Sequence, residues 1–357
     1  MEKKTRLLRI GVLGAGPIAQ NAHFDACRKA KNAELYAICD AAGDLADRMA
    51  AVHAPRAVYH DFDAMLADPL VEAVIIGVAD AFHVPLSQKA VAAGKHVLVE
   101  KPLGLTIEEC EALRQPVQSA GVVFQIGNNL RFDPGNAFAR RFVLEELGQM
   151  LSFKGWYHDS ILRYTMTDNL QPISFTSQNT LKPASNPKDD KRRYFLLTHG
   201  SHLVDLARFL AGEIASLQAR LVEKSGAFCW FVDVDFASGS LGHLDLHVPI
   251  QGDFEQGYQI SGEWGSVKGR GYLPWFYKSS EVECFSIRDR QYHRPLGEDA
   301  FTYKLQVEGF AAAILDGAPQ QGAVLEDGIA AVRAMVAIAR SVETGKRVFL
   351  NEVSGGV

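Results

Sequence analysis

Apolar runs of strand length alternate with helix-like segments through the first third of the chain. The runs lie at Leu7–Leu13, Glu34–Cys39, Val71–Val78, His96–Val99 and Val122–Ile126. The segments that read as helices are Ile18–Lys29, Leu45–Ala51, Val84–Ala93 and Ile107–Ser119. Strands that are apolar on both faces and alternate with helices form parallel sheets covered on both sides. This pattern predicts an α/β domain of the Rossmann type over residues 1–128.

The pattern changes after about Asn129. Long segments such as "QMLSFKGWYHDSI" and "CWFVDVDFASGSLGHLDLHVPI" alternate polar and apolar residues and are joined by short Gly, Ser and Asp turns. Such segments predict a large, mostly antiparallel open-faced sheet with one covered face. Apolar residues at Leu203, Leu206 and Leu210 have the spacing of one helical face. Residues 129–357 are therefore expected to form a second, α+β domain.

Composition narrows the range of partners. The 357 residues carry 37 basic and 42 acidic side chains, a formal charge of −5, which provides no footprint for nucleic acid or an anionic membrane. The five cysteines are scattered without a C-x-x-C pair, so no metal site or disulfide framework is expected. Neither a cleavable leader nor a membrane-length apolar run is visible, and the expected location is the cytoplasm.

A glycine-rich turn follows the first strand. "GAGPIA", from Gly14 to Ala19, fits the G-x-G-x-x-A pattern, in which Gly14 permits the tight turn and Gly16 lets the backbone approach a pyrophosphate. The second strand ends in Asp40, where a carboxylate can bind both ribose hydroxyls of NAD and would repel the 2′-phosphate of NADP. The pattern predicts NAD, with a purely structural turn as the alternative.

Four further motifs occur in a fixed order. They are "GVADAFHVPL" with Asp80 and His83, "VEKPLG" with Glu100 and Lys101, "GNNLRFDP" with Asn129, Arg131 and Phe132, and "GSHLVDLARFLAG" with His202. Together with the glycine turn they resemble the glucose–fructose oxidoreductase/inositol dehydrogenase/MocA family over nearly the whole chain.

The resemblance implies an NAD-dependent dehydrogenase that oxidises a secondary hydroxyl of a sugar, inositol or sugar derivative. His202 would be the acid/base and Lys101 would stabilise the oxygen anion, since an ammonium near the reacting oxygen favours the developing alkoxide. The residues expected at the cofactor are Gly14, Gly16, Pro17, Ile18, Asp40, Asp80, His83, Glu100, Lys101 and Asn129. Those expected at a carbohydrate or polyol substrate are Lys101, Asn129, Arg131, Phe132, Trp156, Thr198, His199 and His202.

One position departs from the family pattern. Many members have Asp four residues before the histidine, and this chain has Thr198, which can form a hydrogen bond but cannot stabilise an imidazolium by charge. Asp205 could share the helix face of His202 and assist catalysis, or it could be a solvated or capping acid. Either the base is tuned differently or the substrate differs from that of the inositol-type enzymes.

Other interpretations stay open. A hydrolase or lyase that holds NAD tightly and oxidises its substrate transiently would use the same residues. A non-catalytic sensor of dinucleotide or sugar is a third class. The resemblance also implies a homodimer or homotetramer, with an exposed apolar sheet face as the physical motive.

One long irregular stretch stands apart from the sheet and helix patterns. Residues 171–193 are rich in Pro, Ser, Asn and charge, and such a loop within a compact domain is often functional. Its charged run, Lys188–Arg193, could bind an acidic substrate or could simply be solvated.

Overall fold

The computed structural model describes residues 6–162, 174–184 and 189–357. They form two compact units. Among the described residues, the first unit comprises 6–129, 174–184, 189 and 302–329, and the second comprises 130–162, 190–301 and 330–357. The chain thus comes back to the first unit twice after residue 129. The sequence pattern did not predict either of these two segments as part of the first domain.

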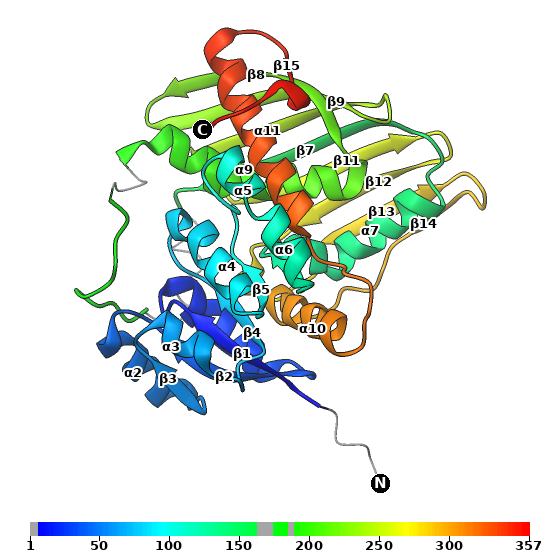
Figure 1. Cartoon of the computed structure of the whole chain (residues 1–357). Coiled ribbons are helices and arrows are strands. Elements are labelled where there is room, and N and C mark those ends of the chain that lie inside the picture. Colours follow the sequence, from blue (N-terminus) through cyan, green and yellow to red (C-terminus); the bar gives the residue numbers. More distant parts are fainter. Residues whose placement is uncertain (1–5, 163–173, 185–188) are drawn as a thin grey trace. The chain divides into compact units, whose positions relative to one another are not determined.

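The first unit is built on a six-stranded parallel sheet with the order β3-β2-β1-β4-β5-β6 (Figure 1). Its strands are β1 Leu8–Leu13, β2 Ala33–Cys39, β3 Ala57–Tyr59, β4 Ala73–Ile76, β5 His96–Val99 and β6 Phe124–Ile126. Every strand pairs in parallel with its neighbours, and β1, β4, β5 and β6 are almost wholly buried. This is the predicted doubly wound sheet, and that part of the fold class is confirmed.

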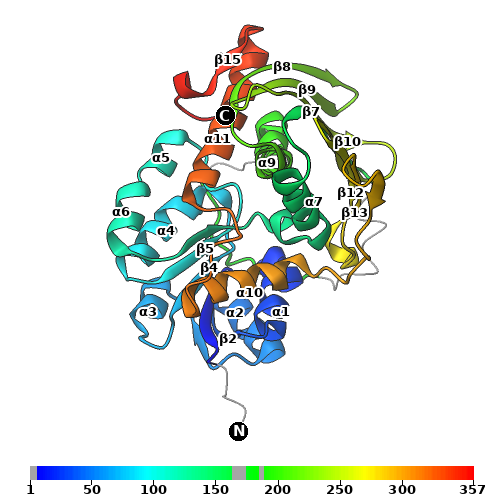
Figure 2. The same ribbon diagram turned by 90° about the vertical axis from the view of Figure 1, so that its right-hand side faces the viewer.

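Helices cover both faces of this sheet. Figure 2 shows α4 and α6 on one side and α1 with α10 on the other. The helical elements of the first unit are the π-helical turn η1 Ala19–His23, α1 Phe24–Lys29, α2 Gly43–His53, α3 Phe62–Ala67, η2 Asp80–Phe82, α4 His83–Ala92, α5 Ile107–Glu111, α6 Arg114–Ala120 and α10 Thr302–Leu315. The two layers give the sheet the burial on both faces that its apolar strands require.

Three local features differ from the sequence prediction. The helix expected over Ile18–Lys29 begins with the π-helical turn η1 and becomes α-helical only at α1. The helix expected over Ile107–Ser119 is divided into α5 and α6, and Pro116 in the first turn of α6 lacks the N–H that a continuous helix would use. The short elements β3 and α3 are absent from the prediction because three half-exposed residues show no clear period.

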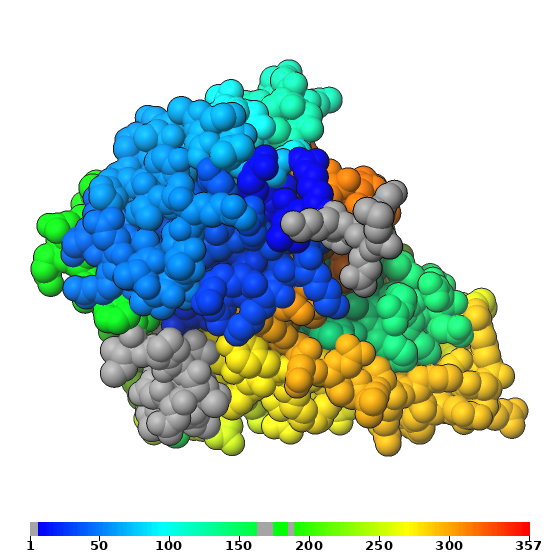
Figure 3. Space-filling model, turned by 90° about the horizontal axis from the view of Figure 1, so that it is seen from below, coloured from blue at the N-terminus to red at the C-terminus, as the bar shows by residue number. Residues whose placement is uncertain are grey.

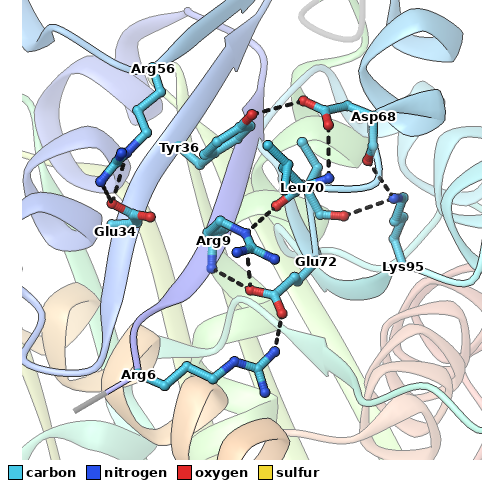
Figure 4. Close-up of polar contacts among 10 residues, drawn as sticks. Arg6, Arg9, Glu34, Tyr36, Arg56, Asp68, Leu70, Glu72 and Lys95 are labelled. Carbon is cyan, nitrogen blue, oxygen red and sulfur yellow. Dashed lines mark hydrogen bonds and ion pairs between the residues drawn. The ribbon is translucent and has the colours of Figure 1, made fainter. Parts of the chain in front are cut away.

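Charged residues at the amino-terminal ends of the strands pair with one another (Figure 4). Glu72, just before β4, binds Arg6 and the backbone N–H of Arg9. Lys95, just before β5, donates to the carbonyls of Asp68 and Val71, both at 2.8 Å. This edge of the sheet is closed by its own side chains.

The second unit is built on a nine-stranded mixed sheet with the order β14-β13-β12-β11-β7-β10-β9-β8-β15. Its strands are β7 Met150–Ser160, β8 Ile214–Lys224, β9 Ala227–Phe236, β10 Leu241–Ile250, β11 Glu255–Gly262, β12 Gly265–Gly271, β13 Glu281–Ser286, β14 Gln291–His293 and β15 Val348–Phe349. All neighbours are antiparallel except β7 and β10, which run parallel. The predicted large, mostly antiparallel sheet is therefore confirmed.

Helices lie on one face of this second sheet, as Figure 2 shows for α7 and α9. The remaining helical elements are η3 Asn129–Phe132, α7 Pro134–Glu145, α9 Lys191–Ala211, η5 Pro274–Phe276, α11 Leu325–Thr344 and η6 Leu350–Glu352. Gly155 on β7 faces Leu203 of α9, so by the alternation of a strand Lys154 and Trp156 point to the opposite face.

The opposite face of the second sheet differs from the apolar surface that the sequence led us to expect. His158 of β7 stacks on His247 of β10 at 4.3 Å, and His243 binds both Asp233 and Asp245. The described residues of this face thus include histidines and acids among its aromatic side chains. Assembly through this face, as a homodimer or homotetramer, stays a prediction.

Asp68 provides a test of the closed amino-terminal edge. Burial opposes its charge, but the Leu70 N–H at 2.8 Å and the hydroxyls of Tyr59 and Tyr36, at 2.7 and 3.1 Å, outweigh burial and hold its pKa below the usual value. The contribution of the Asp68 carboxylate to the stability of the fold is therefore complete above the pKa that this group has in the unfolded chain. It is lost as the pH falls through the lower pKa that the group has in the folded protein. We expect Asp68→Asn to destabilise by about 1–2 kcal/mol at neutral pH, and this loss should become smaller as the pH falls below the unfolded pKa.

Urea unfolding of both proteins at neutral pH and at a pH below the unfolded pKa measures this difference. Asp63→Asn is the matched control, because it breaks an exposed pair with Lys89 that is worth at most about 0.5 kcal/mol. A destabilisation by Asp68→Asn that is the same at both pH values would contradict the assignment.

Candidate functional site

The glycine turn lies at the carboxyl-terminal edge of the first sheet. Gly14 has a φ of +95°, and a Cβ there would come within 2.6 Å of the Gly77 carbonyl oxygen, so only glycine fits. A Cβ on Gly16 would meet no heavy atom within 4 Å. The backbone at Gly16 is thus open to a ligand, beside the exposed Pro17 and the half-buried Ile18. Such a cradle fits a dinucleotide pyrophosphate.

The carboxylate of Asp40 faces this turn. It accepts hydrogen bonds from the backbone N–H of Ala15 at 2.7 Å and from that of Ala42 at 2.8 Å. Each carboxylate oxygen has a second lone pair, so the group can still accept from two ribose hydroxyls. The two amides hold the acid in the orientation that the sequence motif requires.

Glu100 and Lys101 follow β5 at the same edge. Glu100 is 6% exposed, and its Oε1 lies 3.1 Å from Nε2 of His23, which is 1% exposed. This is an ion-pair distance, although the described residues give neither atom an aligned hydrogen bond. Burial opposes ionisation of Glu100, but His23, Lys101 and His83 outweigh burial and lower the carboxyl pKa. The other oxygen accepts the Lys101 N–H at 3.1 Å.

Two predicted cofactor residues from the β4 end lie nearby in the same unit. Asp80 is half-buried at the start of η2. His83 is fully buried, with Nδ1 2.7 Å from the Pro102 carbonyl and Nε2 3.1 Å from the Val78 carbonyl. Its ring therefore joins the segments that follow β4 and β5, and this arrangement favours support of Lys101 over direct contact with the cofactor.

The three predicted site residues of η3, namely Asn129, Arg131 and Phe132, are buried. Asn129 donates to the hydroxyl of Thr302 at 2.8 Å, and Phe132 is part of the core. Arg131 binds Asp205 with both Nε and Nη2, at distances of 2.7–3.1 Å. Arg131 was expected at the substrate and Asp205 beside His202, so the structure joins two residues that the sequence assigned to separate roles. A buried pair of this geometry fixes α9 to the start of the second unit.

His202 lies on α9, against β7. The ring of Tyr157 stacks on it with a centroid distance of 5.8 Å and an interplanar angle of 6°. Trp156, which we expected near the substrate, points to the opposite face of the sheet because neighbouring residues of a strand alternate. Of the two aromatic residues at this point of β7, Tyr157 therefore shares a face with α9, and the expected substrate role of Trp156 stays a prediction.

His199 has the carboxylate partner that the sequence did not reveal. Its Nε2 lies 2.7 Å from Oδ2 of Asp159 on β7, and its Nδ1 lies 2.8 Å from the Thr198 hydroxyl. That hydroxyl donates its one hydrogen to the Tyr194 carbonyl, so it accepts from Nδ1. His199 then carries a positive charge whenever it also donates to Asp159. The signal in the sequence was the alternation along β7, which places Tyr157 and Asp159 on one face.

Lys188, the first residue of the charged run Lys188–Arg193, lies outside the described residues. Asp190 caps α9 by accepting the backbone N–H of Arg193 at 3.0 Å. This contact accounts for one acid of the run as a helix cap.

Two family profiles match this chain. The oxidoreductase family with an NAD-binding Rossmann fold matches residues 8–128, and the C-terminal alpha/beta domain of the same family, that of glucose–fructose oxidoreductase, inositol dehydrogenase and MocA, matches residues 172–350. The chain belongs to this family. The predictions of an oxidoreductase and of NAD as its cofactor are thereby confirmed.

Named relatives within the family include two dehydrogenases of polyols and sugars. Inositol 2-dehydrogenase of Rubrobacter xylanophilus is 25% identical over 365 residues, which cover 97% of this chain and 94% of that protein. Levoglucosan dehydrogenase of Pseudarthrobacter phenanthrenivorans is 30% identical over 162 residues, which cover 45% of this chain and 38% of that protein.

A solved member of the family shares the fold along its full length. A levoglucosan dehydrogenase structure in complex with NADH has a TM-score of 0.77 and 21% identity, and the match covers 98% of this chain and all of that one. Among the described residues of our chain, no helix is both long and apolar enough to cross a bilayer.

Asp40 offers a direct test of cofactor selection in this family member. Asp40→Ser removes the charge and the acceptor of the ribose hydroxyls, so we expect the Kd for NADH to rise by roughly ten- to a hundredfold, as for one or two charged hydrogen bonds. The ratio of the Kd for NADPH to the Kd for NADH should fall by a similar factor, because the repulsion between Asp40 and the 2′-phosphate is lost. NADH and NADPH fluorescence titrations measure both values.

The control for this substitution is Asp47→Ser, which changes an exposed acid of α2 that pairs with His60. Its dissociation constants should stay at the wild-type values. An unchanged preference in Asp40→Ser would show that the acid does not select the cofactor.

Proposed function

We propose that this chain is an NAD-dependent dehydrogenase that oxidises a secondary hydroxyl of a cyclic polyol, sugar or sugar derivative. The observation that carries the proposal is family membership together with relatives named inositol 2-dehydrogenase and levoglucosan dehydrogenase. NAD, when bound, supplies the hydride acceptor. This chain has both residues to which the family resemblance assigns the chemistry, namely Lys101 and His202.

In this proposal Lys101 stabilises the oxygen of the substrate hydroxyl. Its position directly after β5 is where ligands bind in open parallel sheets. The buried Glu100 fixes the Lys101 backbone through its N–H, and His83 fixes the next residue through the Pro102 carbonyl. The main chain around the ammonium is thus held from two sides, which lowers the entropy cost of positioning it.

His202 removes the hydroxyl proton in this proposal. An ordinary imidazole titrates near neutral pH and so can accept a proton during turnover. Stacking by Tyr157 holds the plane of its ring. His199, whose Nε2 lies 2.7 Å from Asp159, contacts the same tyrosine edge-on at a centroid distance of 5.9 Å and, when protonated, can donate to a second substrate oxygen.

The first test uses two substitutions and a substrate panel. With myo-inositol, scyllo-inositol and levoglucosan, wild-type protein and NAD should form NADH, seen by its absorbance. His202→Gln should lower kcat by about 10²–10⁴-fold, the usual loss of a general base, and Lys101→Ala should lower it comparably. The Kd of NADH should change little in His202→Gln.

His293→Gln, at a half-buried histidine of β14 that pairs with Asp289, is the control and should retain activity. Substrate consumption without net NADH, by protein that keeps its cofactor through desalting, would favour the hydrolase or lyase alternative. Wild-type kcat in His202→Gln would remove that histidine from the proposed role.

The second test concerns the charge on His199. Asp159→Asn removes the carboxylate that holds His199 as a cation, so kcat/KM should fall by roughly tenfold and its pH profile should shift. His199→Gln should produce a similar loss, and the double variant should be no worse than either single variant because both act through one contact. Asp245→Asn breaks a comparable pair with His243 on the opposite face and should leave the profile unchanged.

A further inference from the structure

A short surface segment from the irregular part of the sequence docks on the first unit. The segment is Phe175–Thr180, and we call it the strap. Phe175 donates its N–H to Oε1 of Gln20 at 2.9 Å and accepts from Nε2 of the same side chain at 3.0 Å. The amide of Gln20 thus pairs with the strap backbone as another peptide group would. Figure 1 shows this green segment beside α2.

The strap has a second attachment, on α2. The Ser177 hydroxyl donates to Oδ1 of Asp44 at 2.7 Å, and the Asn179 amide donates to the same oxygen at 3.2 Å. These two hydrogen bonds hold the pKa of the exposed Asp44 below its usual value. The guanidinium of Arg48 lies 5.2 Å from the centre of the Phe175 ring. Residues of one helical face of α2 therefore bind both ends of the strap.

The two attachments lie on either side of the cofactor fingerprint. Gln20 also donates to the Ala15 carbonyl at 2.7 Å, so the side chain that binds the strap is fastened to the glycine turn. Asp44 follows Asp40 by four residues, at the start of the helix that leaves the ribose-binding acid. A segment fixed at both points passes from the pyrophosphate turn to the ribose side. In the space-filling view of Figure 3, green atoms lie directly against the blue atoms of this unit.

The strap also has internal order. The Asn179 N–H donates to the Ser177 hydroxyl at 3.0 Å, and the Thr180 hydroxyl donates to the Ser177 carbonyl at 3.1 Å. Ser177 therefore bridges a local turn and the contact with Asp44. Such a turn presents the donors to Asp44 in a fixed arrangement, which lowers the entropy lost on docking.

We propose that the strap retains NAD, by fastening the two sides of the dinucleotide crevice together over the bound cofactor. The contacts with Gln20 and Asp44 must open for the dinucleotide to enter or leave, so the strap slows both steps. The proposal concerns a cofactor-binding segment outside the glycine fingerprint and does not depend on the identity of the substrate.

The test measures NADH release without substrate. Protein loaded with NADH is mixed with excess NAD, and the loss of bound-NADH fluorescence gives the release rate. The double variant Ser177→Ala/Asn179→Ala removes the contact with Asp44 and should release NADH roughly five to twenty times faster, as expected for two lost hydrogen bonds. Phe175→Ala should also accelerate release.

Gln178→Ala is the matched control, because it changes an exposed strap residue for which the described residues provide no side-chain hydrogen bond. Its release rate should equal that of wild type. Equal rates in the double variant and the control would overturn the proposal. Amide exchange over residues 175–180 should slow when NADH binds, and exchange that is unchanged or faster would overturn it as well.

These results are independent of the proposed oxidation. Faster release by the double variant would support the strap even if no sugar or polyol on the panel were oxidised. Wild-type release rates would exclude the strap even if the dehydrogenase activity were found.

Discussion

The hydrogen bond from the Ala15 amide to Asp40 joins the ends of two neighbouring strands, and the cofactor side of the first unit is arranged around it. It can form because β1 and β2 run parallel and end in register, with Leu13 opposite Cys39 and the Gly14 N–H on the Cys39 carbonyl. A side chain at Gly14 would push this turn away from Gly77 and move Ala15 away from the acid. The same residue, Ala15, offers its carbonyl to Gln20 and so connects the turn to the strap.

The two edges of the parallel sheet satisfy their polar groups in different ways. At the amino-terminal edge Glu72, Asp68 and Lys95 are saturated by neighbouring side chains and carbonyls. On the cofactor side, the described residues leave buried oxygens of Asn21, Glu100 and Asn128 without a hydrogen-bond partner. Each such atom costs about 1–3 kcal/mol unless water or a ligand satisfies it. The buried oxygen of Asn32, just before β2, also lacks a partner among the described residues, so unmet polar groups occur at both edges and are more numerous on the predicted cofactor side.

The sequence predicts most strongly what depends on local pattern. Apolar strands such as β1 and β4, and the turn at Gly14, were found because period and residue type identify them without knowledge of the rest. The pairs between distant residues could not be found in this way. Arg131 and Asp205 lie 74 positions apart, and the local sequence around either residue does not predict that the two side chains pair. Asp159 is one of several acids in alternating strands, and only the docking of α9 on β7 selects it as the partner of His199. The strap was visible as an irregular stretch, whereas its attachment to Gln20 and Asp44 was not.

The two histidines of α9 show how one helix can give the same side chain two environments. Positions 199 and 202 are three residues apart, so both rings approach β7, and both contact Tyr157. Oδ2 of Asp159 lies 2.7 Å from Nε2 of the first of them, and a carboxylate at this distance favours the protonated form of the ring. The hydroxyl of Thr198 donates to the Tyr194 carbonyl and lies 2.8 Å from Nδ1 of His199, so it orients this ring without adding a negative charge. The acid that pairs with this histidine thus comes from the neighbouring strand β7, whereas the family pattern led us to expect an acid at position 198 of the helix.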